Sequence, residues 1–152
     1  MQVRLRTILL VFGMVSASLW AADFPMMGTW KLNPARSKLT GAVPKSRTLK
    51  IEPSGSGFKY TIDTIDAQGK PDLRTYTGNV DGKEYTTKWN SGTINWKQID
   101  SRTWETTAMV AGKVIEISRR VVSPDGKVLT TTTALLDAQG QPVLTIAVYD
   151  KQ

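Results

Sequence analysis

Turn signals recur along this chain at short intervals, and the segments between them are no longer than single β-strands. Glycine combined with Asp or Asn marks the turns, as in Asp81-Gly82, Asn90-Ser-Gly92 and Pro124-Asp-Gly126. These residues suit reversals because they adopt the left-handed backbone conformation at little cost. No long stretch has the 3.6-residue period of an amphipathic helix. The spacing therefore predicts an all-β, antiparallel domain.

The segments between the turns are rich in Thr, Val, Ile, Trp and Tyr, which suit pleated strands. Ten of them have strand length: Thr29–Asn33, Thr48–Glu52, Phe58–Ile65, Asp72–Val80, Glu84–Trp89, Thr93–Ile99, Thr103–Val110, Val114–Val122, Val128–Leu136 and Val143–Tyr149. Most connections are short enough for hairpins, so consecutive strands pair. An up-and-down meander of eight to ten strands tends to close into a barrel, because closure removes exposed edges. Residues 33–45 are the exception, and Asn33-Pro34 favours one helical turn at Ala35–Leu39.

The first 21 residues predict an export signal. Arg4 and Arg6 precede the apolar run Thr7–Val15, and small residues lead to a cleavage site after Ala21. The run is too short to span a bilayer, and an uncleaved membrane anchor is the alternative. We therefore expect residues 22–152 to form one barrel domain, located in the periplasm or secreted.

The composition excludes several kinds of chemistry. The 152 residues include no Cys and no His, which excludes disulfides, thiol nucleophiles, Cys/His zinc sites and a Ser-His-Asp triad. Removal of the leader, with its two arginines, lowers the formal net charge from +7 to +5. The remaining cations are scattered rather than clustered as on a nucleic-acid-binding face. We expect no nucleic acid, metal or cofactor as a partner.

Two similar segments, Asp66-Ala-Gln-Gly69 and Asp137-Ala-Gln-Gly140, deserve comparison with metal loops. They lack the alternating acidic positions of a calcium loop. We interpret them as two hairpin turns of the same kind.

Several short motifs resemble the lipocalin and fatty-acid-binding protein superfamily. Phe24-x-x-x-Gly28-Thr-Trp-Lys-Leu32 is similar to its opening, where Gly-x-Trp begins the first strand, and Val148-Tyr-Asp-Lys151 is similar to the close of fatty-acid-binding proteins. Most of the chain resembles small exported bacterial lipocalin-like proteins. The resemblance implies structural roles for Gly28 and Trp30. The chain departs from fatty-acid-binding proteins at Ala147, where they carry an arginine, and in residues 33–45, which are too few for their two-helix lid.

Two polar residues stand out as candidates for ligand binding. Gly112-Lys113 followed by Ile117 and Arg119 matches the strand that leads to a ligand-binding arginine in fatty-acid-binding proteins. Arg119 shares its face with apolar residues, so it needs an anion or an aromatic partner. It is expected either to bind a ligand carboxylate in the lumen or to lie over Trp30. Tyr149 matches the family's terminal tyrosine, as a donor to a ligand head group or as a buried structural residue.

The aromatic residues Tyr60, Trp96 and Trp104 are candidates for the wall of an apolar pocket, or else core residues. The sequence places no pair of carboxylates together, and we expect no enzymatic activity. The leading hypothesis is a barrel that binds a small apolar or amphipathic ligand. The alternative is a non-catalytic envelope or inhibitor-like module whose barrel is filled, and a cavity of several hundred Å³ would distinguish the two.

Overall fold

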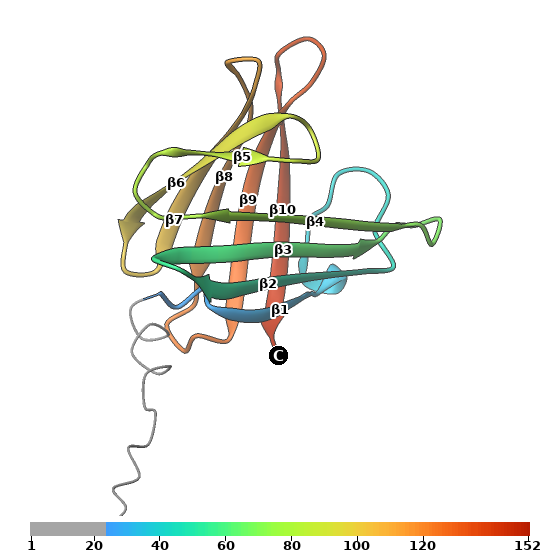
Figure 1. Ribbon diagram of the computed structural model, residues 1–152. Helices are drawn as coiled ribbons and strands as arrows, with labels where there is room; N and C mark the ends of the chain where they lie inside the picture. The colour runs from blue at the N-terminus through green and yellow to red at the C-terminus, as the bar shows by residue number, and fades with distance from the viewer. Residues whose placement is uncertain (1–23) are drawn as a thin grey trace, which may run out of the picture.

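The computed structural model describes residues 24–152, which form the predicted antiparallel up-and-down barrel (Figure 1). The predicted export signal lies outside the described residues. The ten strands are β1 (Gly28–Leu32), β2 (Ser46–Ser54), β3 (Gly57–Ile65), β4 (Pro71–Gly78), β5 (Glu84–Thr87), β6 (Gly92–Asp100), β7 (Thr103–Val110), β8 (Lys113–Val122), β9 (Val128–Leu136) and β10 (Pro142–Lys151). Each bound lies within two residues of the predicted one, because turn residues set the limits of every strand.

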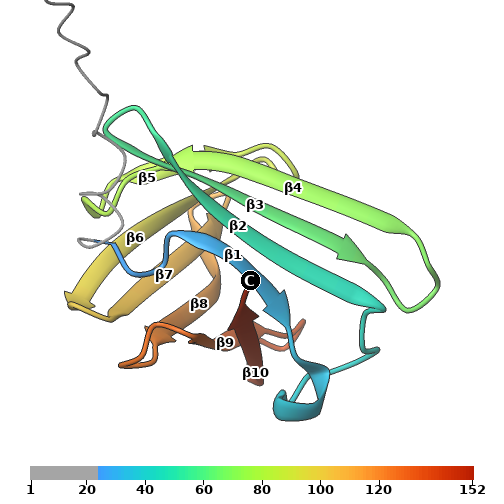
Figure 2. The ribbon, with the colours of Figure 1, turned by 90° about the horizontal axis from the view of Figure 1, so that it is seen from below.

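All ten strands belong to one sheet, in the order β4-β3-β2-β1-β10-β9-β8-β7-β6-β5. Consecutive strands are therefore neighbours, and β1 pairs with β10 to close the ring on that side. The ladder is interrupted at one place, between β4 and β5, where the two sheet edges face each other. Figure 1 and Figure 2 show β1–β4 crossing β7–β10 at a steep angle, so that the strands enclose a lumen.

The segment between β1 and β2 contains a 3₁₀ turn, η1 (Pro34–Arg36), somewhat shorter than the predicted helical turn. As expected, Pro34 occupies the first helical position and the Asn33 side chain accepts a hydrogen bond from the Arg36 N–H. The Lys38 backbone then pairs with Ile146 of β10. These contacts hold residues 33–45 against the end of the barrel.

The two Asp-Ala-Gln-Gly segments form the same turn, as predicted. Asp66 Oδ1 accepts hydrogen bonds from the N–H groups of Gln68 at 2.9 Å and Lys70 at 2.8 Å. Asp137 Oδ1 makes the equivalent bonds at 2.9 and 2.8 Å. Each carboxylate is thus used by its own turn.

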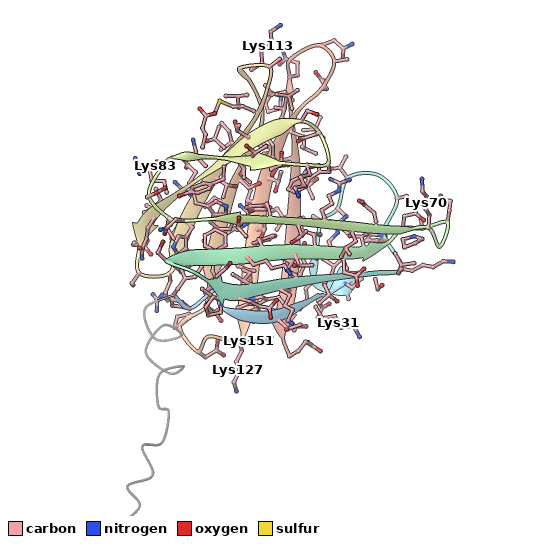
Figure 3. The ribbon with its side chains drawn as sticks, in the orientation of Figure 1. Lys31, Lys70, Lys83, Lys113, Lys127 and Lys151 are labelled. Carbon is pink, nitrogen blue, oxygen red and sulfur yellow. The ribbon has the colours of Figure 1, made fainter. Side chains whose placement is uncertain are left out.

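The up-and-down order divides the connections between two ends of the barrel. At the closed end lie the β2–β3, β4–β5, β6–β7 and β8–β9 turns, and at the open end lie residues 33–45 and the other turns. In Figure 3, Lys127 and Lys151 mark the closed end, while Lys70 and Lys113 mark the open end. The closed end is filled by large buried side chains, namely Phe24, Met26, Trp30, Phe58, Trp96 and Trp104.

Trp30 anchors the closed end. Its side chain is completely buried, and its Nε1–H donates to the Met26 carbonyl at 2.8 Å. The Lys151 ammonium lies 5.0 Å from the centre of the Trp30 ring, in the place that Arg119 was expected to take. Gly28 precedes this cluster with a φ of 122°, a conformation that side chains rarely adopt.

Candidate functional site

The open half of the barrel contains two cavities of about 360 Å³ each. Cavity 1 lies next to residues 39–44 and the β10 wall, and its lining includes Leu49, Ala147 and Tyr149. Cavity 2 lies next to the β5–β6 turn, and its lining includes Trp89 and Ile94. Six residues line both cavities: Tyr60, Ile62, Arg74, Glu116, Arg120 and Leu135.

Arg120 is the buried cation of this lumen. Its side chain comes from β8 and is 7% exposed. The guanidinium carbon lies 4.7 Å from the centre of the Trp96 ring and 5.9 Å from that of Tyr60, and its Nη1 donates to the Thr106 hydroxyl. Burial acts to lower the pKa of Arg120, but Tyr60, Tyr76 and Glu116 outweigh it and raise that pKa, so the group stays charged.

The expectation that Arg119 points into the lumen was wrong. The Arg119 side chain is 58% exposed on the outer face of the barrel, where its Nη2 lies 3.8 Å from Glu105 Oε2. It contacts neither cavity and does not lie over Trp30. A surface pair of this kind contributes little stability.

A β-bulge explains why the neighbouring arginine faces inward. The β7–β8 hairpin pairs Val110 with Lys113, and an unbroken ladder from there would pair Trp104 with Arg119. The register shifts by one residue between Ala108 and Met109. Trp104 consequently pairs with Arg120. Because a one-residue slip exchanges the two faces of a strand, Arg120 faces the lumen and Arg119 faces outward.

The outward face of β8 is apolar, which is the opposite of the usual pattern. Ile117 and Val121 are 45% and 39% exposed, whereas the fully buried Ser118 points inward. The Ser118 hydroxyl bonds to Glu116 Oε1 at 2.7 Å and to the Thr133 hydroxyl at 2.9 Å. The buried Ser118 hydroxyl is thus satisfied by polar neighbours, and hydrophobic alternation was a misleading guide to the inner face of β8.

Tyr149 and Tyr60 both lie on the cavity walls. Tyr149 lines cavity 1 and is buried, and burial is the main cause that raises the pKa of its phenol. The positive charges of Arg47 and Arg120 act in the opposite direction on that pKa, and both arginines line cavity 1 together with Tyr149. Sequence reasoning missed Arg47, which β2 contributes to the same cavity.

Trp96 and Trp104 are core residues and line neither cavity. Trp96 is fully buried beneath Arg120, and its Nε1–H donates to the Tyr76 hydroxyl at 2.9 Å. Trp104 packs edge-on against Phe24 at 5.2 Å, in the filled closed end. Of the two roles considered for these tryptophans, pocket wall or core, the structure supports the core role.

Three buried polar atoms have no hydrogen-bond partner among residues 24–152: Arg120 Nε, Thr131 Oγ1 and Trp104 Nε1. The first two belong to residues that line cavity 1. Within residues 24–152, neither Arg120 nor Arg47 has a carboxylate within ion-pair distance. Cavity 1 thus combines two guanidinium groups that have no carboxylate partner with a buried hydroxyl that has no hydrogen-bond partner in this range.

Residues 24–152 contain no group of three acidic, His or Cys side chains that could hold a metal ion. None of the helices in this range is long and apolar enough to cross a membrane.

No protein-family model matches the sequence, and no curated protein matches it significantly. Solved structures do match the fold. A fatty acid binding protein of Schistosoma mansoni in complex with arachidonic acid has a TM-score of 0.58 and 15% identity, over 86% of this chain and 98% of that chain. A zebrafish ileal bile acid-binding protein complexed with cholic acid has a TM-score of 0.51 and 13% identity, over 84% of this chain and 99% of that chain. The fold is therefore the ten-stranded barrel of the fatty-acid-binding type.

Proposed function

We propose that this protein binds an amphipathic anion in the barrel lumen. Cavity 1 receives the ligand, with the anionic head group at Arg120, Arg47 and Tyr149. The apolar part of the ligand lies against the aliphatic wall residues Leu39, Leu49, Ile62, Leu135 and Ala147.

The observation that carries this proposal is the buried, unpaired charge of Arg120 beside an open cavity. Removing an ion from water costs several kcal/mol unless a counter-charge or good hydrogen bonds replace the solvent. The aromatic contacts and the Thr106 hydroxyl supply part of this compensation. Arg120 Nε remains without a partner in the described chain. A carboxylate in cavity 1 would supply that partner, because guanidinium and carboxylate pair in a bidentate manner.

Two further observations support an anionic, lipid-like ligand. The structurally similar proteins were solved with arachidonic acid and cholic acid, both of which are amphipathic molecules with one carboxylate. Exposed apolar side chains also lie near the open end, notably Val43, Leu73, Leu136 and Leu144. An apolar rim is typical of a ligand entrance or an interaction surface.

The filled-barrel alternative lacks this support. It requires a lumen packed with side chains, whereas the two cavities each have the volume of a ligand site. In a filled barrel that acts only through its surface, a buried cation without a carboxylate partner would lower stability and make no contact with the partner protein.

The proposal is tested by calorimetric titration of residues 22–152 with hexadecanoate and, in parallel, with hexadecanol. We expect saturable binding of the acid and at least tenfold weaker binding of the alcohol, which lacks the charge. Arg120→Gln is expected to remove this preference, while Arg119→Gln, which alters the exposed neighbour, serves as the matched control. Equal binding of acid and alcohol, or equal effects of the two substitutions, would overturn the proposal.

We also propose that the chain is exported, with cleavage after Ala21. The support is the pattern of Arg4, Arg6 and the apolar run that follows. Expression of the whole chain in a Gram-negative host should yield a periplasmic product that begins at Ala22, as measured by intact mass. An uncleaved product in the membrane fraction would contradict this.

A further inference from the structure

We propose that cavity 2 is a second binding site, for an uncharged ring compound, and that it is occupied together with cavity 1. This proposal shares the lumen with the proposed function but names a different ligand class and a different set of wall residues. Cavity 2 has an aromatic wall, contains no cation that is specific to it and unpaired, and lies beside Arg120.

One wall of cavity 2 is a row of three aromatic rings. The Tyr60 and Tyr76 rings stack with centres 5.4 Å apart and an angle of 22° between their planes. Trp89 continues the row, with its centre 5.6 Å from that of Tyr76. The facing aliphatic residues are Ile94, Ala108 and Ile115. Aromatic side chains provide a large and rigid apolar contact area, which favours a rigid apolar ring compound that loses little conformational entropy on binding.

The charges around cavity 2 are compensated once the proposed head group is bound in cavity 1. Arg74 Nε donates to Asp72 Oδ2 at 2.8 Å. Arg120 lines both cavities, and a carboxylate in cavity 1 would neutralise its guanidinium. Arg47 lines cavity 1 and not cavity 2. With the head group in place, cavity 2 offers a second ligand no uncompensated cation, so a neutral ligand is favoured.

Asn90 supplies a polar contact at the mouth of cavity 2. Its Oδ1 accepts hydrogen bonds from the Thr87 hydroxyl at 2.6 Å and from the Gly92 N–H at 3.1 Å. These two bonds fix the orientation of the amide. The Nδ2 group is then the donor available to a hydroxyl or carbonyl oxygen on the edge of a ring compound.

The two cavities are suited to simultaneous occupation. The residues that they share come from β3 and β4 on one wall and from β8 and β9 on the other. An unbranched chain with its head group held between Arg120 and Arg47 extends into cavity 1. Such a ligand leaves the aromatic row and about 360 Å³ of cavity 2 free for a second molecule.

Pyrene, a neutral fused-ring fluorophore, is a suitable probe for cavity 2, with hexadecanoate as the probe for cavity 1. We expect one pyrene per protein at saturation, retained when hexadecanoate is added to saturation. Ala108→Phe fills cavity 2 and should weaken pyrene binding at least tenfold, with hexadecanoate binding unchanged. Trp89→Ala should also weaken pyrene binding at least tenfold, and the exposed Lys88→Ala is its matched control. Circular dichroism verifies that each variant is folded.

The outcomes separate this inference from the proposed function. Pyrene binding without hexadecanoate binding would overturn the proposed function and leave the second site standing. Hexadecanoate binding without pyrene binding would overturn the second site alone. Displacement of pyrene by hexadecanoate in equal amounts would show a single shared site and would also overturn this inference.

Discussion

The guanidinium of Arg120 lies over the ring of Trp96, 4.7 Å from its centre, and both side chains are buried in the barrel. This pair joins the filled closed end to the open lumen, because Trp96 belongs to the core and Arg120 lines both cavities. Among residues 24–152, no carboxylate lies within ion-pair distance of this buried charge.

Arg120→Met should therefore abolish the preference for anionic ligands without lowering the stability of the free protein. Burial of an unpaired charge costs several kcal/mol, and the contacts to Trp96 and Tyr60 return about 2 kcal/mol. We expect the free energy of unfolding in urea to be unchanged or higher by about 1 kcal/mol. A loss of more than about 2 kcal/mol would mean that the aromatic contacts outweigh the desolvation.

Ligand binding should stabilise the wild-type protein and not the Arg120→Met variant. Binding to the folded state alone adds about 2.7 kcal/mol at a free ligand concentration of 100 times Kd. We expect hexadecanoate to raise the thermal midpoint of the wild type and of Arg119→Met by similar amounts. An equal rise in Arg120→Met would contradict a head-group site at this residue.

Stability should fall at alkaline pH because Tyr76 and Tyr149 keep their protons in the folded state. Burial is the main cause that raises the pKa of both phenols. Between the pKa of an unfolded tyrosine, about 10, and the higher folded value, the folded state binds more protons, so the free energy of unfolding decreases as pH rises. Each such tyrosine contributes up to about 1.4 kcal/mol per pH unit in that window and nothing to the slope well below it.

Tyr149→Phe tests whether the free energy of unfolding falls with rising pH because of this tyrosine. Urea unfolding between pH 8 and pH 11 should show a shallower decline for the variant than for the wild type. The difference between the two curves should be constant up to about pH 9. Parallel curves over the whole range would show that Tyr149 titrates alike in the folded and unfolded states.

Gly28→Ala should destabilise the closed end by about 1–3 kcal/mol, because a φ of 122° is strained for a residue with a Cβ. An added Cβ would also lie 3.1 Å from Lys151 Cε. The double substitution with Lys151→Ala separates these causes. If backbone strain dominates, as we expect, the cost of Gly28→Ala measured by urea unfolding is the same in the Lys151→Ala background. Full rescue there would assign the cost to the side-chain contact.

The fold followed from the sequence because turn residues are local signals. Asp66 and Asp137 bond to N–H groups two and four residues ahead, and such turns fix where strands start and stop. Hairpin connections then leave a single strand order to consider. The pairing of β1 with β10 has no local signal, and closure of the barrel was expected only because it removes exposed strand edges.

The site was harder to predict because it depends on register and on distant strands. Tyr60 and Tyr149 line cavity 1, whereas Trp96 and Trp104 are core residues; binding of a ligand by the two tyrosines stays a prediction. Arg47 was missed because it is far from Arg120 in the sequence, and no local pattern indicates that β2 and β8 line the same cavity. Arg119 was preferred to Arg120 because its neighbours are apolar, and here the apolar face is the outer one.

The bulge in β8 determines which face of the strand each later residue occupies. Ile115 is the residue without a pairing partner between Val114 and Glu116. Everything from Glu116 onward is displaced by one position relative to β7, which is why Arg120 and not Arg119 supplies charge to the lumen. Only one of the two adjacent arginines can face the lumen, and the number of residues between the β7–β8 turn and the arginines determines which one does. Inserting or deleting a single residue in this hairpin would turn the inner face of β8 outward, although every residue that lines the lumen would still be present in the sequence.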